Sequence, residues 1–565
     1  MKNIWNKLEK KKGIIIIALV LFMSLGFTTL SDKDFKIAKN LDIFVTLFRE
    51  INLYYVDDKD PEELIESSIE GMLESLDPYT TFIPESEKDE FKFMTTGQYG
   101  GIGALIRRAG EYTIISEPYE GFPAQKSGLM AGDTIITIDG KSIKGTDISD
   151  VSELLKGKPN TEVDLVIKRY GDSETRTFSL IREKVTIKNV PYYDIIDNVG
   201  YIRLGNFHEN AGEEVGSALK ELLDKKPKGI IIDLRNNPGG LLKEAVNVAG
   251  VFVGKGQEIV STKGKVKHWD NDYTTITEPV DTNIQLVVLV NRSSASASEI
   301  VAGALQDLDR AVVIGQRTFG KGLVQVTRPL SYNTQLKITT AKYYIPSGRC
   351  IQALDYSHRN EDGSVGHIPD SLISEFLTRN GRKVYDGGGV NPDIKIEYDV
   401  PGNISVSLYA ENLFFDYATK YSTEYDSIKP LDKFVVTDEI FNDFKSFIQD
   451  KEFDYNSQSS EKLEELIEIA KQEKYYDLAK DEFVNIEKKL KSDKVQDLTT
   501  FKEEIKELIE EEIMSRYYYQ KGRIRSAINH DPQIDKAIEV INNNELYTSV
   551  LTGTYKDGEI ITAKN

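Results

Sequence analysis

The chain has 565 residues and a mass of 63.8 kDa, which is too long for one hydrophobic core, so several domains are expected. Its 71 Lys and Arg are outnumbered by 91 Asp and Glu, and the net charge of −20 argues against a broad basic surface for nucleic acid. The single cysteine, Cys350, excludes an intramolecular disulfide framework and multi-cysteine metal sites.

The first 31 residues combine a lysine-rich start with an uncharged apolar stretch. Lys2, Lys7 and the three lysines at 10–12 precede residues 14–30, which carry no charge. This order is typical of a signal segment, and the positive-inside rule then leaves the N-terminus in the cytoplasm. Because neither an Ala-x-Ala site nor a cysteine for lipid attachment follows, an uncleaved membrane anchor is favoured over a cleaved signal peptide. We therefore expect an exported, periplasmic protein that is anchored in the inner membrane.

Periodicity divides the rest of the chain into four segments. Residues 32–95 have apolar positions at helical spacing, which predicts an N-terminal helical domain. Residues 96–185 read as short strands around one helix, a compact β-rich module. From residue 186 to 400, strands and helices alternate as in a layered α/β core. Residues 401–565 are acidic and mostly of helical period, so a helical extension is expected to pack on the core as a docking or gating element.

Individual elements can be placed in the two middle segments. The β-rich module is expected to contain strands at 112–116, 134–138, 163–169 and 175–181 and a helix at 148–155. The core is expected to contain strands at 200–204, 229–234, 285–290, 311–314, 322–327, 336–345 and 394–398, with helices ending near 223, 252 and 308.

Histidine-based and metal-based sites find no support in the sequence. The five histidines are scattered, none lies in a His-Glu-x-x-His motif, and no Gly-x-Ser-x-Gly occurs. Gly315 to Gly322 nearly matches a phosphate-binding loop, but its last residue is glycine, which lacks the hydroxyl that would hold magnesium. A strand follows this loop in place of the required helix. Neither nucleotide binding nor any other cofactor is expected.

A cluster of serines between a strand and an apolar helix is the first candidate for chemistry. It runs from Asn291 to Ile300, and a serine before Glu299 is also an ordinary helix cap. A catalytic serine needs a base, and a lysine can serve only if desolvation lowers its pKa from about 10.4. Lys321 lies between two glycines and before apolar residues, which suits a buried lysine.

A second candidate is the run Ile230 to Gly240, a buried strand that ends in Asn-Pro-Gly-Gly. Such a turn into a helix directs backbone N–H groups at a common point, which suits a developing oxyanion. A simple glycine turn explains the run equally well.

Together these segments resemble the tail-specific, or C-terminal processing, protease family. Ser296, Lys321 25 positions later and Gln325 four positions beyond it carry the resemblance, together with Asp233 to Gly240. The resemblance spans residues 35–400, and these further segments agree with it in order: Gly71 to Pro78, Gly157 to Pro159, Tyr344 to Arg349 and Gly388 to Asp393.

The resemblance implies a layered α/β protease core of the Clp protease/crotonase type with an inserted PDZ domain. It implies Ser296 as nucleophile, Lys321 as general base and Gln325 as the residue that positions the lysine. It further implies that Gly239 and Ala297 supply the amides of an oxyanion hole and that no metal takes part.

The β-rich module resembles a PDZ domain. Tyr99 to Ala104 corresponds to the carboxylate-binding loop, in which Gly101, Ile102 and Gly103 would hold a peptide carboxylate. The helix near 151–155 would line the groove. In such domains backbone N–H groups bind the terminal carboxylate, while the extended peptide adds a strand to the sheet edge. Polypeptides with unstructured, apolar C-termini are therefore the expected substrates.

The predicted function is that of an exported serine endopeptidase that recognises polypeptide C-termini and cleaves through an acyl-enzyme on Ser296. A catalytically silent PDZ adaptor on the same core is the alternative, and retention of serine, lysine and glutamine together argues against it. A lysine-dependent hydrolase of a non-peptide ester is disfavoured by the PDZ-like module. A second copy or an adaptor protein stays open as a partner. Tyr79 stands where relatives often have histidine, and we expect it to lie outside the dyad without affecting activity.

Overall fold

The structure is a computed structural model that describes residues 32–360, 362–397, 401–451, 453, 458–490 and 494–555. The signal or anchor segment predicted for residues 1–31 lies outside them. Within the described ranges, we find no helix with the length and apolar character that a membrane span requires. The chain divides into two units, Met1–Pro78 and Tyr79–Asn565.

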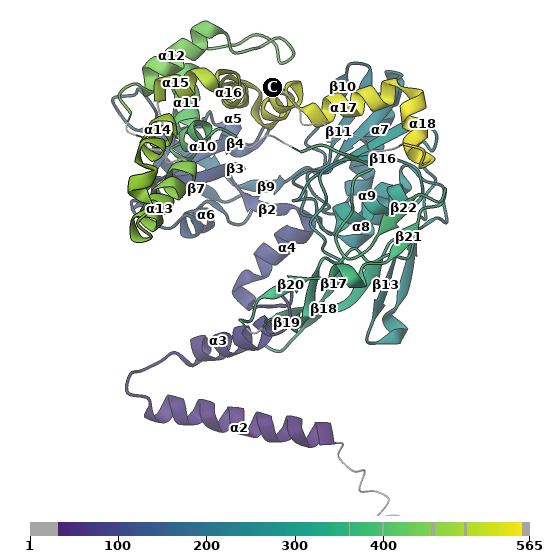
Figure 1. Cartoon of the computed structure of the whole chain (residues 1–565). Coiled ribbons are helices and arrows are strands. Elements are labelled where there is room, and N and C mark those ends of the chain that lie inside the picture. The colour runs from purple at the N-terminus through teal and green to yellow at the C-terminus, as the bar shows by residue number, and fades with distance from the viewer. Residues whose placement is uncertain are drawn as a thin grey trace, which may run out of the picture. The chain divides into compact units, whose positions relative to one another are not determined.

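The described part of the first unit, residues 32–78, contains two helices, α2 (Asp32–Tyr54) and α3 (Pro61–Glu74) (Figure 1). The Asp60 carboxylate caps α3 by accepting the amide of Glu62 at 2.8 Å, and Pro61 stands at the first helical position, where its missing N–H costs nothing. No residue of α2 is buried. The N-terminal helical segment expected from the sequence is confirmed.

The second unit is built around a six-stranded sheet that is parallel except for one edge strand. The order is β10-β11-β12-β15-β16-β23, and only β10 runs antiparallel to its neighbour. Parallel neighbours need crossover helices, which is why strands and helices alternate along this part of the sequence. The strands are β10 (Tyr192–Ile196), β11 (Val199–Arg203), β12 (Gly229–Asp233), β15 (Gln285–Val290), β16 (Val312–Gly315) and β23 (Ile394–Lys395).

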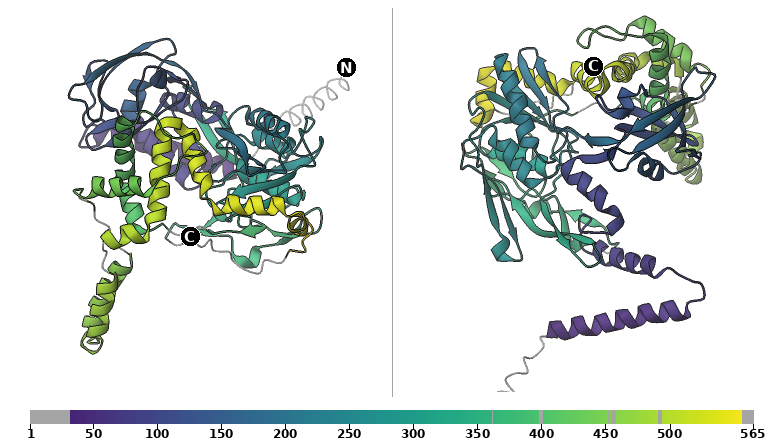
Figure 2. Two further views of the ribbon diagram at one scale, coloured as in Figure 1. Left: turned by 90° about the horizontal axis from the view of Figure 1, so that it is seen from above. Right: turned by 180° about the vertical axis from the view of Figure 1, so that it is seen from behind.

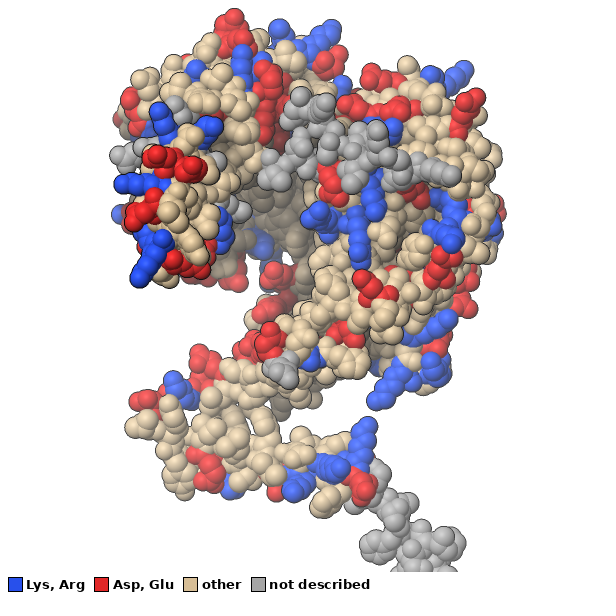
Figure 3. All heavy atoms as spheres, in the orientation of Figure 1, with Lys and Arg blue, Asp and Glu red and all other residues tan. Residues whose placement is uncertain are grey.

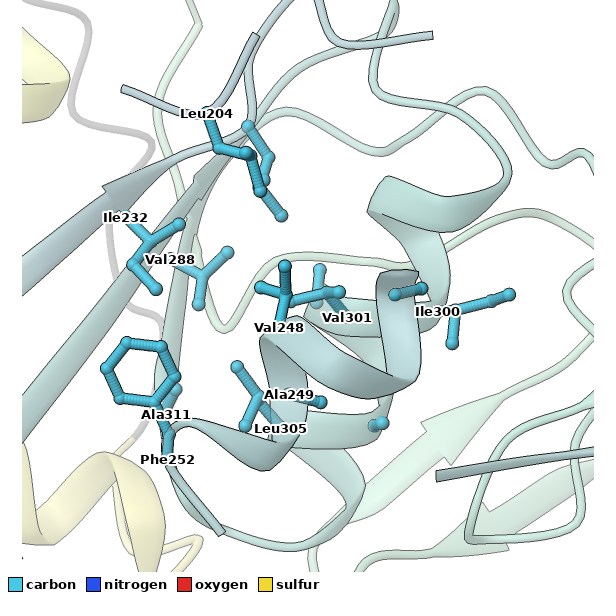
Figure 4. Close-up of a cluster of buried hydrophobic side chains, with 14 of the residues drawn as sticks. Leu204, Ile232, Val248, Ala249, Phe252, Val288, Ile300, Val301, Leu305 and Ala311 are labelled. Carbon is cyan, nitrogen blue, oxygen red and sulfur yellow. The ribbon is translucent and has the colours of Figure 1, made fainter. Parts of the chain in front are cut away.

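Three helices cover one face of this sheet: α7 (Ala211–Asp224), α8 (Leu242–Gly250) and α9 (Ala297–Asp307). Their apolar side chains meet those of the strands in one buried cluster, in which Val301 of α9 lies with Val288 of β15 (Figure 4). Every residue of α9 is buried, as expected for a helix with protein on all sides. The first turn of α9 is therefore firmly placed.

Two helices at the end of the chain cover the opposite face, α17 (Pro532–Asn542) and α18 (Asn544–Leu551) (Figure 2). Ile534 and Ile541 of α17 belong to the same buried cluster as Val287 of β15. Val288, the next residue of the strand, belongs to the cluster on the side of α7, α8 and α9. Because successive strand residues point to opposite faces, the two clusters lie on the two sides of one sheet. The end of the extension thus completes a three-layer α/β/α core.

A second, antiparallel sheet lies beside this core. Its order is β1-β18-β13-β14, with β17 also paired to β18, and the register of β17 on β18 shifts between Val324 and Gln325. The elements here are β1 (Thr81–Ile83), α4 (Lys88–Thr96), β13 (Glu258–Gly264), β14 (Asn271–Thr274), β17 (Leu323–Pro329) and β18 (Gln335–Tyr344). Two hairpins follow, β19 (Leu354–Arg359) with β20 (Val365–His367), and β21 (Glu375–Leu377) with β22 (Lys383–Tyr385).

The β-rich module begins and ends in a two-stranded antiparallel ribbon, β2 (Gln98–Gly101) with β9 (Glu183–Thr186). Its sheet has the order β3-β4-β5-β7-β8, so β3 is an edge strand, and α6 (Ile148–Leu155) lies beside it. An edge strand beside a helix can accept a peptide as an added strand. The other elements are β3 (Ala104–Ala109), β4 (Tyr112–Pro118), α5 (Pro123–Lys126), β5 (Thr134–Ile138), β6 (Lys141–Ser142), β7 (Glu162–Lys168) and β8 (Arg176–Ile181).

The first part of the C-terminal extension has a core of its own, in which the stacked rings of Phe414 and Phe444 lie 5.4 Å apart. Its longest helix, α16, is interrupted at Tyr519, whose φ of 53° and ψ of −146° are not helical. The helices are α10 (Asn403–Ala410), α11 (Leu413–Glu424), α12 (Asp438–Ile448), α13 (Gln458–Gln472), α14 (Lys480–Leu490), α15 (Lys494–Thr500) and α16 (Lys502–Asn529). The predicted helical extension is confirmed.

Charges of both signs are interleaved over the face drawn in Figure 3. Among the described residues on this face, Lys and Arg form no continuous stripe of the kind that tracks a phosphate backbone.

Candidate active site

Ser296 forms the sharp turn between the loop after β15 and the first residue of α9. Its φ of 54° and ψ of −114° lie in a region that residues with a side chain rarely adopt. Such a conformation persists only where the surroundings hold it, and it occurs often at active sites. The two buried serines of the cluster already form hydrogen bonds, since the hydroxyls of Ser294 and Ser298 donate to the carbonyls of Leu234 and Asn237, respectively, both at 2.9 Å.

Glu299, one turn into α9, holds the predicted nucleophile and the predicted base by their backbones. Its Oε2 accepts the amides of Ser296 and Lys321, both at 2.9 Å. Its Oε1 accepts the amide of Gly320 at 2.7 Å and the hydroxyl of Thr318 at 2.5 Å. Burial raises the pKa of Glu299 to about 7, against the opposing effect of these four hydrogen bonds. The sequence shows this residue only as part of a Ser-x-x-Glu helix start, which is too common to identify a site.

Tyr343 of β18 makes a second connection between the same two segments. Its hydroxyl lies 3.2 Å from the carbonyl oxygen of Ser296 and within hydrogen-bond distance of the carbonyl oxygen of Lys321. Burial, and to a smaller extent the charge of the nearby Glu299, raises the pKa of the Tyr343 phenol well above its usual value, so the hydroxyl keeps its proton. Tyr343 was not predicted from the sequence, because no local motif marks it.

Lys321 lies just before β17, and its ammonium contacts an aromatic ring. The Nζ atom is 4.3 Å from the centroid of the Tyr79 ring, and Tyr79 packs edge to face on Tyr356 at 6.0 Å. Tyr79 is not a member of the predicted dyad, but its ring touches the predicted base, so we expect it to affect activity, contrary to the expectation from the sequence. A ring face stabilises the ammonium form of a lysine relative to the neutral amine.

Replacing Tyr79 by leucine is expected to make the base function at lower pH. Without the ring the ammonium is less stable, so the pH at half-maximal acylation by a small activated ester should fall by about half a unit. Tyr79→Phe is the control, because it retains the ring face and should leave this midpoint in place. An unchanged midpoint in the leucine variant would contradict a role for the ring.

Gln325 lies in β17 where the register on β18 shifts. Its Nε2 donates to the hydroxyl oxygen of Thr339 at 3.1 Å, and the amide of Thr339 donates to the hydroxyl oxygen of Thr80 at 3.2 Å. These bonds orient the glutamine on the sheet. Its role in positioning Lys321 stays a prediction.

The Asn-Pro-Gly-Gly turn lies directly against the serine turn. A Cβ built on Gly239 would lie 2.8 Å from the Ser296 Cβ and 2.9 Å from the Ala297 nitrogen, so only glycine fits there, at its φ of 98°. The amide of Ala297 has no acceptor among the described residues, whereas those of the next three residues donate to the preceding turn. The amide of Gly239 donates to Asn237 Oδ1 at 2.9 Å and would have to be shared with an oxyanion.

A buried ion cluster ends the strand that leads into this turn. Arg235 Nε and Nη2 donate to Asp233 Oδ1 and Oδ2, at 2.9 and 2.6 Å. Arg203 Nη1 and the Tyr201 hydroxyl each lie 2.7 Å from Asp233 Oδ2. Burial alone would raise the pKa of Asp233, but the two guanidinium groups and these hydrogen bonds hold it well below its usual range. Paired in this way, the charges fix the end of β12.

The predicted carboxylate loop of the β-rich module is shorter than expected. Residues 99–101 belong to strand β2, so the loop consists of Ile102 and Gly103. Their carbonyls accept the amides of Ala124 and Tyr119, both at 2.8 Å, whereas their own amides have no acceptor in the part of the chain that the structure describes. Two such amides in sequence are suited to a carboxylate.

The sequence matches "Peptidase family S41" over residues 198–357, "PDZ domain" over 114–169 and "Probable PDZ-protease, C-terminal helical domain" over 404–541. It is 36% identical over 373 residues to the carboxy-terminal-processing protease of Bartonella bacilliformis, an alignment that covers 65% of this chain and 82% of the relative. The chain belongs to the carboxy-terminal-processing proteases of peptidase family S41. This protease is therefore a serine-type peptidase with a PDZ domain, and the predicted family and fold class are confirmed.

Other relatives of the protease have matching names. A "Probable CtpA-like serine protease" of Staphylococcus aureus is 34% identical over 342 residues, covering 60% of this chain and 67% of the relative. A solved structure named photosystem II D1 C-terminal processing protease is 30% identical and covers 63% of this chain and 92% of its own, with a TM-score of 0.34. The S41 match contains Ser296, Lys321 and Gln325, whereas the PDZ match begins after the loop at Ile102 and Gly103.

Proposed function

We propose that this protease captures the C-terminus of a polypeptide in its PDZ domain and cleaves a peptide bond with Ser296 and Lys321. The observation that supports this most strongly is the Glu299 carboxylate, one oxygen of which accepts the amides of both residues. A buried carboxylate that fixes a strained serine and a lysine to one point is suited to a nucleophile and its base.

In the proposed reaction, the neutral amine of Lys321 takes the proton of the Ser296 hydroxyl while Oγ attacks the peptide carbonyl carbon. The carbonyl oxygen becomes an oxyanion, which the backbone amides of Ala297 and Gly239 stabilise together. Lys321 returns the proton to the departing amine, and the C–N bond breaks to leave an ester on Ser296. Water then hydrolyses this ester by the same proton transfers, which regenerates the free serine.

The PDZ domain is proposed to bind the substrate's terminal carboxylate at the amides of Ile102 and Gly103, with the peptide extended along the edge strand β3. Amidating the C-terminus of a peptide substrate should therefore raise its KM by about tenfold or more, because a carboxylate forms much stronger hydrogen bonds than an amide. Steady-state kinetics on matched free-acid and amidated peptides measures this. Equal KM values would contradict C-terminal recognition by this loop.

A pair of glycine variants locates the same effect on the loop. Gly103 has a φ of 71°, and a Cβ there would lie 2.4 Å from the Cβ of Phe122, so Gly103→Ala should distort the loop and raise KM for the free-acid peptide. Gly110 also has a positive φ, of 59°, but its Cβ would meet nothing within 4 Å, which makes Gly110→Ala the matched control. Neither change should slow hydrolysis of a small activated ester.

We further propose that the protease is exported and stays attached to the inner membrane. The support is the lysine-rich start followed by the uncharged residues 14–30. In cells that produce the full chain, externally added proteinase should digest the protein in spheroplasts without lysis. Digestion only after lysis would contradict export.

A further inference from the structure

The C-terminal extension reaches the strand end from which the Asn-Pro-Gly-Gly turn departs. Asp531 Oδ2 lies 2.5 Å from Arg235 Nη1, and Gln533 Oε1 lies 3.3 Å from the same nitrogen. Asp233 already accepts the other two guanidinium nitrogens. The extension therefore supplies two acceptors for the third nitrogen of a side chain that is 7% exposed.

Arg235 fixes the start of the turn through its backbone as well. Its amide donates to Asp233 Oδ1 at 2.9 Å, and its carbonyl accepts Arg203 Nη2 at 2.7 Å. The next residues along the chain are Asn236 and Asn237, and Gly239 follows against the serine turn. A shift of Arg235 would therefore displace the proposed oxyanion amide.

The Asp531 carboxylate is itself held rigidly. It is the N-cap of α17, and its Oδ1 accepts the amides of Gln533 at 2.9 Å and Ile534 at 3.3 Å. Ile534 is buried on the outer face of the core sheet. Asp531 and Asp233 contact different nitrogens of the Arg235 guanidinium, so removing the charge of Asp531 takes one carboxylate away from a nearly buried cation.

The helix before this contact is also attached to the PDZ domain. Lys521 Nζ of α16 lies 2.9 Å from Glu120 Oε2. Arg523 Nη2 of the same helix lies 3.5 Å from Glu117 Oε2. A cavity of about 370 Å³ lies between these contacts and the core, and Arg235, Arg523 and Asp531 all line it. One continuous segment of the extension thus touches both the peptide-binding domain and the strand end at the active site.

We propose that Asp531 is a positioning residue, which holds Arg235 and through it the Asn-Pro-Gly-Gly turn in the geometry that stabilises the oxyanion. The extension is then part of the machinery for cleavage and not only a docking element. This inference rests on the proposed function of Ser296 and Gly239.

Two variants with opposite properties test it. Asp531→Asn keeps a good N-cap but removes the negative charge from Arg235, whereas Asp531→Glu keeps the charge but is not a preferred cap. The asparagine variant should lower kcat for both a peptide and a small activated ester, on the order of tenfold to a hundredfold, with KM for the peptide unchanged. The glutamate variant should recover most of kcat. If stability alone mattered, their order would be reversed.

Glu539→Gln is the control, because Glu539 is an exposed residue of the same helix that pairs with Lys536, and its change should leave both rates at the wild-type level. The inference is overturned if Asp531→Asn hydrolyses the ester at the wild-type rate, if only its KM changes, or if Asp531→Glu is as slow as Asp531→Asn. Ser296→Ala separates the two proposals. Should it be inactive while Asp531→Asn is fully active, only the positioning role fails; should it be active, the proposed function fails first.

Discussion

Replacing Ser296 or Lys321 by alanine is expected to reduce peptide cleavage to below about one percent of the wild-type rate, without loss of fold. The nucleophile and its base act as one unit, so the double variant should be no slower than either single variant. The measurement is kcat/KM on a free-acid peptide, with far-UV circular dichroism as the check on folding.

Ser293→Ala is the matched control, since Ser293 belongs to the same serine cluster but is exposed. It should keep wild-type activity. A Ser296 or Lys321 variant with more than about one percent of the wild-type rate would refute the assignment of these two residues.

Glu299→Gln is expected to lower kcat by about a hundredfold or more, because the variant cannot keep all four hydrogen bonds. All four partners are donors, two on each oxygen, whereas glutamine has only one acceptor oxygen and replaces the other with an NH2 group, which donates. The turn at Ser296 and the segment at Lys321 would then lose their common point of attachment. Glu244→Gln, a change at another buried glutamate that accepts the amide of Gly212, is the control.

The same residue should also make stability depend on pH. Burial raises the pKa of Glu299 from 4.5 to about 7 in the folded state, so folding favours its protonated form. Its contribution to stability is fully present below pH 4.5 and is lost as the pH rises through about 7. Activity should change in the opposite direction, because only the ionised carboxylate accepts all four bonds. Unfolding midpoints between pH 5 and 8 should therefore fall less steeply in Glu299→Gln, and an identical slope would contradict this assignment.

Local sequence patterns were sufficient to predict helices and strands in which the apolar residues are also the buried ones. The strand at 134–138 and the helix at 148–155 have the predicted bounds, because apolar periodicity there coincides with burial. The ribbon that joins the β-rich module to the core was not predicted. Its strand β2 ends in two glycines, which carry no strand signal, and its partner β9 lies at the far end of the module.

The site shows the same limit. Spaced motifs led to Ser296 and Lys321, but the contact of Lys321 with Tyr79 joins residues that are distant along the chain and share no motif. Glu299 was visible as a helix cap, and only its complete burial distinguishes it from an ordinary one. Asp531 could not be found at all from the sequence, because the packing of α17 on the core sheet determines what its carboxylate meets.

The position of α17 and α18 on the core sheet determines when the core can be completed during synthesis of the chain. A polypeptide is made from its N-terminus, and domains generally fold as units once their parts are present. The serine, the lysine and every strand of the core are therefore synthesised long before the two helices that cover one side of the sheet. Until α17 and α18 are made, Ile231 and Val287 lack the helices that cover them, so the nascent chain contains the predicted nucleophile and base before its core is complete.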